Sequence, residues 1–218
     1  MKLKTEKYLT QNSQWPQKGK VILAQYDEES IVVYQAYRSS IGHFAVTHKY
    51  FGGDFKLDRM SWIKPNFLWM MYRSGWGTKD GQEVILAITL KREAFDQILS
   101  LVVHSSFDSS RYANEKDWKY ALKSSSVRLQ WDPDHDPIGT KLTRKAIQLG
   151  LRNETLEKYS KEWVLDIEDI SEFVKEQRSN ARPTLYENLV TPKENLYLIK
   201  DPELAKRVGA STSENMSL

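Results

Sequence analysis

The sequence predicts a single α+β domain followed by an extended C-terminal arm. Runs of β-branched and aromatic residues typical of strands recur along the chain, and segments with helical spacing separate them. Of the 218 residues, 40% are hydrophobic, which is enough to bury one core. We place the domain at residues 1–179 and the arm, with a frayed tail, at 180–218, because the second stretch contains several prolines and ends in a Ser-rich tract without periodicity.

The first elements are expected to be two strands and a helix. The runs KVILAQY at 20–26 and SIVVYQAY at 30–37 have the composition of strands. Ser39 and Ser40 are suited to cap a helix, whose apolar residues recur at helical spacing until the glycine pair at 52–53.

The middle of the chain predicts a short helix and a central strand. Pro65 is favoured as the first residue of a helix that stops at Gly75, so residues 58–77 are expected to form a loop, a helix and a turn. The run EVILAITL at 83–90 is continuous enough for a strand covered on both faces. A helix is expected from about 92 to 101.

The second half is less regular. Residues 125–133 predict a strand closed by Pro133, and TKLTRKAIQLGLR at 140–152 is interpreted as an amphipathic helix. A further helix is expected at 166–177. Its apolar stripe would consist of Ile167, Ile170, Phe173 and Val174.

Composition excludes several kinds of chemistry. The chain has 32 Lys plus Arg against 29 Asp plus Glu, and this net charge of +3 permits a nucleic-acid partner without requiring one. It has no Cys, which excludes disulfides, zinc–thiolate sites and thiol nucleophiles. The apolar runs are far shorter than the roughly 20 residues of a membrane span, so we expect a cytoplasmic protein without a membrane partner.

The motif WDPDHDP places three acidic residues, Asp132, Asp134 and Asp136, at alternate positions. This spacing matches the start of a calcium-binding EF-hand loop, but Pro137 stands where glycine is needed and Thr143 where a bidentate Glu is needed. A solvated Pro–Asp turn is favoured over a magnesium or manganese site. We therefore expect no metal.

The stretch DRMSWIKPNFLWMMYRSGWG at 58–77 combines bulky and cationic side chains. Packing in a core would explain its Trp and Met residues, but it does not explain Arg59, Lys64 and Arg73 among them. Two interpretations remain open at this point: a packed core with solvated cations, or a ligand site in which rings stack and cations bind phosphate.

Four segments carry a family resemblance. YQAY, RMSWIKPNFLWMMYRSGW, VRLQWDPDHDP and RKAIQLGLR, in this order, closely resemble the proteins grouped as domain of unknown function 4291. The resemblance spans residues 21–177. This family name implies no activity.

The order of the parts is also similar, more distantly, to that of DNA-targeting ADP-ribosyltransferases. The resemblance implies a mixed, split central β-sheet flanked by helices, with NAD in its cleft. It also implies an NAD-dependent glycosyltransferase that acts on single-stranded or duplex nucleic acid. KPNFLWMMY at 64–72 stands where those enzymes cradle NAD, and a late strand offers Gln130 and Asp132 where they usually carry Glu.

The resemblance assigns roles to individual residues. Cleavage of the nicotinamide–ribose bond builds positive charge on the sugar, so Asp132 is expected to stabilise it and Gln130 to orient the reactants. On a strand these two side chains share one face with Arg128. The expected cofactor-binding residues are Arg38, Arg59, Trp62, Lys64, Trp69 and Arg73. Most of the four cations among them are expected to converge on one cleft, with Trp62 or Trp69 on its wall.

Two alternatives remain open. Aromatic residues interleaved with basic ones also suit a non-catalytic nucleic-acid-binding module, although the weak net charge and the acidic motif argue against it. A metal-dependent nuclease would use the WDPDHD cluster. Binding of NAD or of oligonucleotides, with and without magnesium, separates the three readings.

Overall fold

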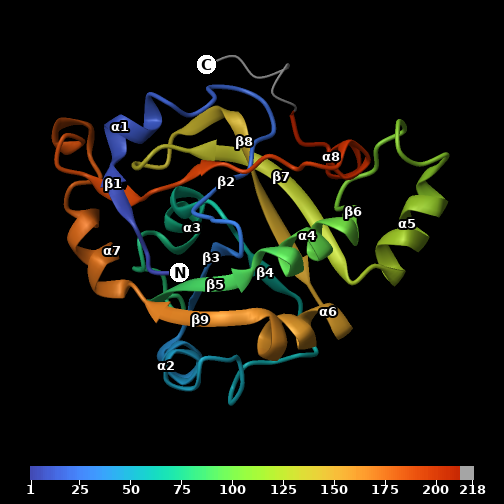
Figure 1. Ribbon diagram of the computed structural model, residues 1–218, viewed down its shortest axis with the longest axis horizontal. Helices are drawn as coiled ribbons and strands as arrows, with labels where there is room; N and C mark the ends of the chain where they lie inside the picture. Colours follow the sequence, from blue (N-terminus) through green and yellow to red (C-terminus); the bar gives the residue numbers. More distant parts are fainter. Residues whose placement is uncertain (212–218) are drawn as a thin grey trace.

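Two β-sheets form the centre of the computed structural model, which describes residues 1–211 (Figure 1). The first sheet is antiparallel and contains, in spatial order, β3 (Ser30–Tyr37), β5 (Val84–Lys91) and β9 (Val164–Asp169). The second contains β4 (Ser61–Ile63), β8 (Lys141–Leu151), β7 (Val127–His135) and β6 (Val102–His104). Because β6 pairs with β7 in parallel and the other pairs are antiparallel, this sheet is mixed. The expected α+β class is confirmed.

The two sheets meet at one isolated bridge between Tyr34 on β3 and Lys64, just after β4. The Tyr34 N–H donates to the Lys64 carbonyl at 2.7 Å, and the Lys64 N–H donates to the Tyr34 carbonyl at 3.3 Å. On either side of this bridge the strands of the two sheets are not paired within residues 1–211. The central sheet is therefore split, and Lys64 lies at the junction.

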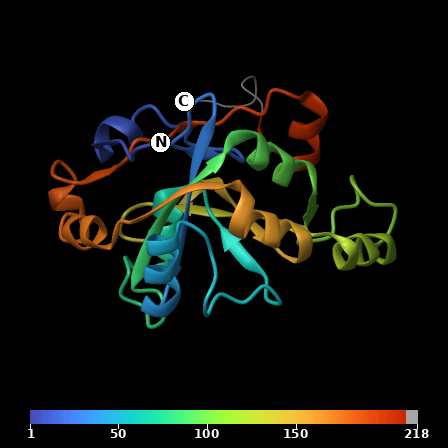
Figure 2. The ribbon, with the colours of Figure 1, turned by 60° about the horizontal axis from the view of Figure 1, so that its bottom comes forward.

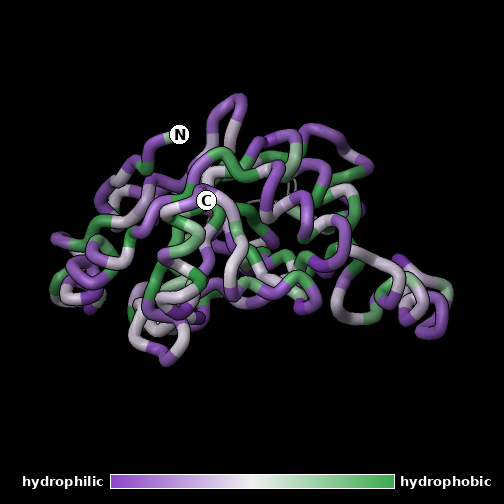
Figure 3. Tube along the Cα trace, turned by 90° about the horizontal axis from the view of Figure 1, so that it is seen from below, coloured by the Kyte–Doolittle hydropathy of each residue, from purple (hydrophilic) through white to green (hydrophobic). Residues whose placement is uncertain are grey.

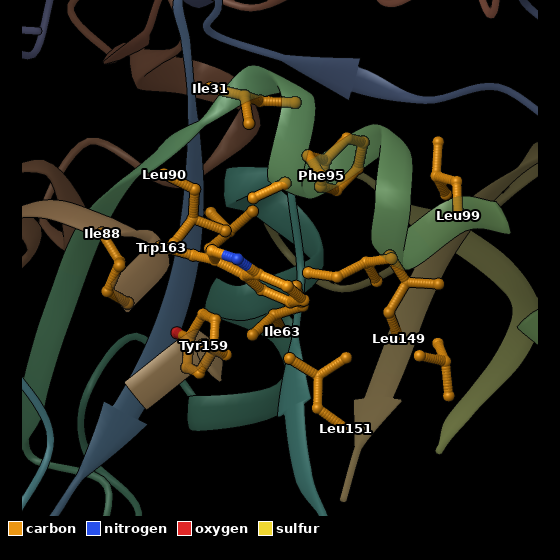
Figure 4. Close-up of a cluster of buried hydrophobic side chains, with 14 of the residues drawn as sticks. Ile31, Ile63, Ile88, Leu90, Phe95, Leu99, Leu149, Leu151, Tyr159 and Trp163 are labelled. Carbon is orange, nitrogen blue, oxygen red and sulfur yellow. The ribbon is translucent and has the colours of Figure 1, made fainter. Parts of the chain in front are cut away.

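A large apolar core fills the space between the sheets (Figure 4). Figure 4 shows Ile88 and Leu90 of the first sheet facing Leu149 and Leu151 of the second. α4 (Arg92–Ser100) adds Phe95, and the π-helical turn η1 (Tyr159–Trp163) adds both of its terminal aromatic residues. A second cluster lies on the other face of the first sheet, where α3 (Phe67–Ser74) packs against β3. In Figure 3, hydrophobic segments run through the middle of the molecule, and many of the outer loops are hydrophilic.

Other helices lie around the two sheets. α2 (Ser39–His48) lies beside β9, and α7 (Ser171–Arg178) follows β9 (Figure 2). α6 (Asn153–Lys158) leads into η1. α5 (Glu115–Ser124) buries none of its residues and projects from one end of the molecule in Figures 1 to 3. Within residues 1–211 no helix is long and apolar enough to cross a membrane.

The C-terminal arm pairs with the start of the chain. The first elements are β1 (Thr5–Lys7), α1 (Tyr8–Asn12) and β2 (Leu23–Ala24). The arm carries η2 (Pro183–Leu185), β10 (Val190–Pro192), β11 (Asn195–Leu196) and α8 (Pro202–Val208). β10 pairs with β1 and β11 with β2, and the arm buries Leu189 and Tyr197. The expected frayed tail falls largely on residues 212–218, which lie outside the described residues.

Several sequence-based expectations are wrong. Residues 141–151 form strand β8 and not a helix, because pairing along β7 overrides their helix propensity. Residues 166–177 contain the end of β9 and then α7, so Ile167 lies on a strand.

The ends of two other elements also differ. Residues 61–63 form β4 where a loop was expected, and α3 begins after its cap Asn66, so Pro65 precedes the helix. β7 continues past Pro133 to His135, with an irregular register between these two residues.

Candidate active site at the split of the sheet

One face of the second sheet carries a row of polar side chains. The register of β7 and β8 pairs Arg128 with Gly150, Gln130 with Gln148, and Asp132 with Ala146. Side chains alternate along a strand, so these positions share the face opposite the apolar core. Trp62 pairs with Gly150 from the other side of β8 and therefore joins the same face.

The Asp132 carboxylate is held by two amide groups. Gln130 Nε2 donates to Asp132 Oδ1 at 2.8 Å, and Gln148 Nε2 donates to Asp132 Oδ2 at 2.7 Å. Each oxygen keeps a further lone pair, and the side chain is only half-buried. The two amides thus fix the direction of a carboxylate that remains able to interact with a ligand.

Lys64 is the most unusual residue of this region. It is 5% exposed, and among residues 1–211 its ammonium group makes no hydrogen bond or ion pair. Burial and, to a smaller extent, the positive charge of Arg73 lower the pKa of Lys64, the negative charge of Asp132 opposes them, and the net result is a pKa of about 8. Lys64 is therefore within electrostatic reach of both Arg73 and Asp132.

Trp62 lies over Gly150. A Cβ atom at Gly150 would lie 2.6 Å from the sulfur of Met60 and 3.0 Å from the Trp62 ring, so only glycine allows the indole to approach the strand. Beside it, Nε of Arg128 is buried without a hydrogen-bond partner among the described residues. A ring and an unsatisfied donor thus lie on the same face as Asp132, at the Gly150 end of the polar row.

Helix α3 forms the wall next to this face and carries Arg73, which is exposed. The helix is capped twice: Asn66 Oδ1 accepts from the Trp69 N–H at 2.7 Å, and Glu194 Oε1 of the C-terminal arm accepts from the Phe67 N–H at 2.6 Å. Burial raises the pKa of Glu194. Gly75, at φ +59°, ends the helix in the left-handed conformation.

Trp69 does not offer a free ring. It is 4% exposed and stacks with Tyr72 and His135, whose own rings lie parallel with centroids 3.5 Å apart. The Trp69 indole nitrogen has no hydrogen-bond partner in the described part of the chain. Because its ring is buried, Trp69 supports the wall, and the partly exposed Trp62 is the better stacking residue.

Arg38 and Arg59 lie elsewhere, in a pocket of about 410 Å³ beyond the ends of β3 and β4. Tyr37, Lys56 and Ser61 also line this pocket. The Tyr37 and Ser61 hydroxyl oxygens are 2.7 Å apart, and burial raises the pKa of Tyr37.

The four expected cations therefore form two pairs and do not share one cleft. Arg38 and Arg59 line the pocket, while Lys64 lies within electrostatic reach of Arg73 and Asp132. Strand β4 connects the pocket with Lys64. Ser61, at the start of β4, lines the pocket, and Lys64 follows its last residue, about 10 Å further along the extended chain.

The acidic motif is divided among three structural roles. Asp134 Oδ2 accepts from Arg144 Nε at 2.6 Å, with both side chains 1% exposed. Asp136 Oδ1 accepts two backbone N–H groups of the following turn. Within residues 1–211 no group of three or more His, Asp or Glu side chains is placed to hold a metal ion. Of the three aspartates, Asp132 alone faces the polar row.

Sequence reasoning missed Gln148, Gly150 and Ser61. Gln148 and Gly150 lie on β8, where the sequence predicts a helix. Ser61 begins β4, where the sequence predicts a loop. The alternation of Ile147, Leu149 and Leu151 with polar or small residues was the signal that would have revealed the strand.

Comparison with known proteins identifies a family without an activity. The family model described as "Domain of unknown function (DUF4291)" matches residues 21–197. The comparison with curated proteins found no match.

Proposed function

The chain belongs to the DUF4291 family, and we propose that it transfers ADP-ribose from NAD to a nucleic-acid acceptor. One observation carries the proposal. A carboxylate oriented by two amides, Asp132, lies within electrostatic reach of the buried cation Lys64, which has no partner among residues 1–211 and lies where the central sheet splits. The split mixed sheet adds support, because the ADP-ribosyltransferases that the sequence resembles bind NAD in such a cleft.

The chemistry of the transfer matches the charges of this face. The bond between the ribose carbon and nicotinamide breaks, and nicotinamide leaves as a neutral molecule with the electron pair of that bond. The ribose becomes cationic, and Asp132 stabilises it because Gln130 and Gln148 hold the carboxylate in position before the reaction. A nucleophilic atom of the acceptor then bonds to the ribose carbon. Its proton passes to Lys64 when the amine is neutral, or to water.

The two pairs of cations serve two anionic groups. Arg38 and Arg59 line the pocket that receives the diphosphate of NAD, since guanidinium groups match phosphate oxygens. Its volume of about 410 Å³ lies within the range of small-molecule sites. Trp62 offers a ring for nicotinamide, and the exposed Arg73 contacts a phosphate of the acceptor strand.

Asp132→Asn tests the proposal. Asn keeps the size of the side chain but removes its charge, so the variant is expected to fold and to bind NAD while transfer slows by about 10²-fold or more. Transfer is measured with radiolabelled NAD and DNA or RNA oligonucleotides, and NAD binding is measured by thermal shift. The control is Glu176→Gln on α7, which neutralises an exposed carboxylate and should change neither quantity.

Other outcomes would replace the proposal. Oligonucleotide binding without any NAD-dependent stabilisation, unchanged in Asp132→Asn, would make the protein a nucleic-acid-binding module. Magnesium-dependent cleavage of the oligonucleotide would make it a nuclease. Full transfer activity in Asp132→Asn would remove the catalytic role of this carboxylate.

A further inference from the structure

A second cavity lies at the edge of the second sheet, where β6 ends and β7 continues. Its volume is about 540 Å³, and its walls come from β7, the loop after β6 and the segment before β2. Leu129, Gln130 and Trp131 of β7 line it. Side chains alternate along β7, so Leu129 and Trp131 project to the face opposite Asp132, while Gln130 borders both this cavity and the site proposed above. Asp132, Lys64 and the arginines of the first pocket do not line this cavity.

Two lysines are placed side by side at this cavity. Lys20 and Lys145 are paired through the backbone: the Lys145 N–H donates to the Gly19 carbonyl at 2.7 Å, and the Val21 N–H donates to the Lys145 carbonyl at 3.1 Å. Neither ammonium group makes an ion pair among residues 1–211. The backbone bridge thus fixes the two residues next to each other, and each ammonium group lies within electrostatic reach of the other.

The surrounding charges do not neutralise this pair. The pKa of Lys20 is lowered by burial, then by the positive charges of Arg111 and Lys145. Asp108 also lines the cavity, but its Oδ2 accepts from Arg111 Nε at 3.1 Å and its Oδ1 accepts from Ser110. The cavity therefore keeps the net positive charge of two lysines.

The loop after β6 adds hydroxyl donors. Ser105, Ser106 and Ser109 line the cavity, and none of their hydroxyl groups has a hydrogen bond among the described residues. His104 lies at the start of the loop, and burial lowers its pKa. Uncommitted hydroxyl groups beside uncompensated ammonium groups are the donors that bind phosphate oxygens.

We propose that this cavity binds a phosphate group, with Lys20 and Lys145 as its charged ligands and the serine hydroxyls as further donors. The phosphate belongs either to a small phosphorylated molecule or to the backbone of a nucleic-acid strand. Both sources present the same anionic oxygens, so the test has an arm for each. A bound phosphate would also relieve the repulsion between the two lysines.

Binding is measured on the full chain with two probes. Inorganic phosphate is titrated by calorimetry against chloride at constant ionic strength, and a short single-stranded oligothymidylate is titrated by fluorescence anisotropy. The variant Lys20→Gln/Lys145→Gln is expected to weaken whichever probe binds by at least about tenfold, because it removes charge-assisted hydrogen bonds. For the oligonucleotide, the dependence of affinity on salt should also become less steep.

The control variant loses two positive charges at positions outside the cavity. Lys116→Gln/Lys161→Gln removes two exposed lysines that make no hydrogen bond or ion pair within residues 1–211, and it should bind like the unmodified protein. Lys145→Gln alone, at an exposed position, keeps the test valid if the double variant is unstable.

The result decides the proposal in either direction. Saturable binding of phosphate or of the oligonucleotide that depends on these lysines supports it, and the probe that binds identifies the source. No saturable binding of either probe, or equal losses in the test and control variants, overturns it. Stabilisation by NAD is measured on the same proteins and should not change, so failure here is distinguishable from failure of the transferase proposal.

Discussion

Replacing Lys64 by methionine is expected to stabilise the protein. Burial, with the charge of Arg73, lowers the pKa of Lys64 from 10.5 to about 8. Since one pKa unit corresponds to about 1.4 kcal/mol, holding the charged form in this position costs about 3 kcal/mol at pH 7. Methionine has a similar length and no charge, so Lys64→Met should raise the free energy of unfolding by up to this amount. At about 2–4 °C per kcal/mol, the melting temperature rises by roughly 6–12 °C.

The pH dependence gives a sharper test than the size of the effect. The folded-state pKa of Lys64 is below its unfolded value, so between about pH 8 and 10.5 the unfolded chain binds more protons. The free energy of unfolding of the unmodified protein therefore rises with pH across this window, as the destabilising charge of Lys64 is lost. The difference between the variant and the unmodified protein should be largest below pH 8 and vanish above pH 10.5. Urea unfolding at several pH values measures it.

Lys161→Met is the control, because Lys161 is exposed. Its effect on stability should stay within about 0.5 kcal/mol at every pH. A Lys64→Met protein that is less stable at pH 7, or a stability difference that does not change between pH 7 and 10.5, would show that Lys64 does not carry a desolvated charge.

Three further substitutions test other contacts. Arg144→Met leaves the Asp134 carboxylate buried without its partner and should cost about 3–5 kcal/mol in denaturant unfolding; an unchanged midpoint would contradict the buried ion pair. Gly150→Ala forces Trp62 away from the strand, which should lower the free energy of unfolding by about 1–3 kcal/mol and change the Trp fluorescence. Unaltered emission would show that the Trp62 ring does not lie over Gly150. Glu194→Ala should lower the free energy of unfolding by about 1–2 kcal/mol and speed hydrogen exchange at the first amide of α3. Unchanged exchange would show that Glu194 does not cap this helix.

Local sequence patterns were sufficient for part of the candidate site. Gln130 and Asp132 were expected to share one face because alternation along a strand depends only on the strand itself. The structure adds the hydrogen bond between them. The end of α3 was also predictable, since the positive φ of Gly75 is a local requirement.

Pairing between distant segments was not predictable from the same patterns. Residues 141–151 are rich in Leu, Lys, Arg, Ala and Gln, which favour helices, and their strand conformation comes from pairing with β7. The second amide on Asp132, from Gln148, was missed for this reason. Asp134 similarly has the spacing of a metal ligand, yet its partner Arg144 is reached only when β7 and β8 pair.

The cap that Glu194 provides has a consequence for the order of events during synthesis. α3 is complete once residue 74 has been made, but the carboxylate that binds its first amide belongs to a residue added 120 positions later. The same arm also supplies β10 and β11, which pair with β1 and β2. During synthesis, the wall that carries Arg73 therefore acquires its second cap only after residue 194 has left the ribosome. A released chain that ends before residue 194 would contain every strand of the two central sheets but lack this contact.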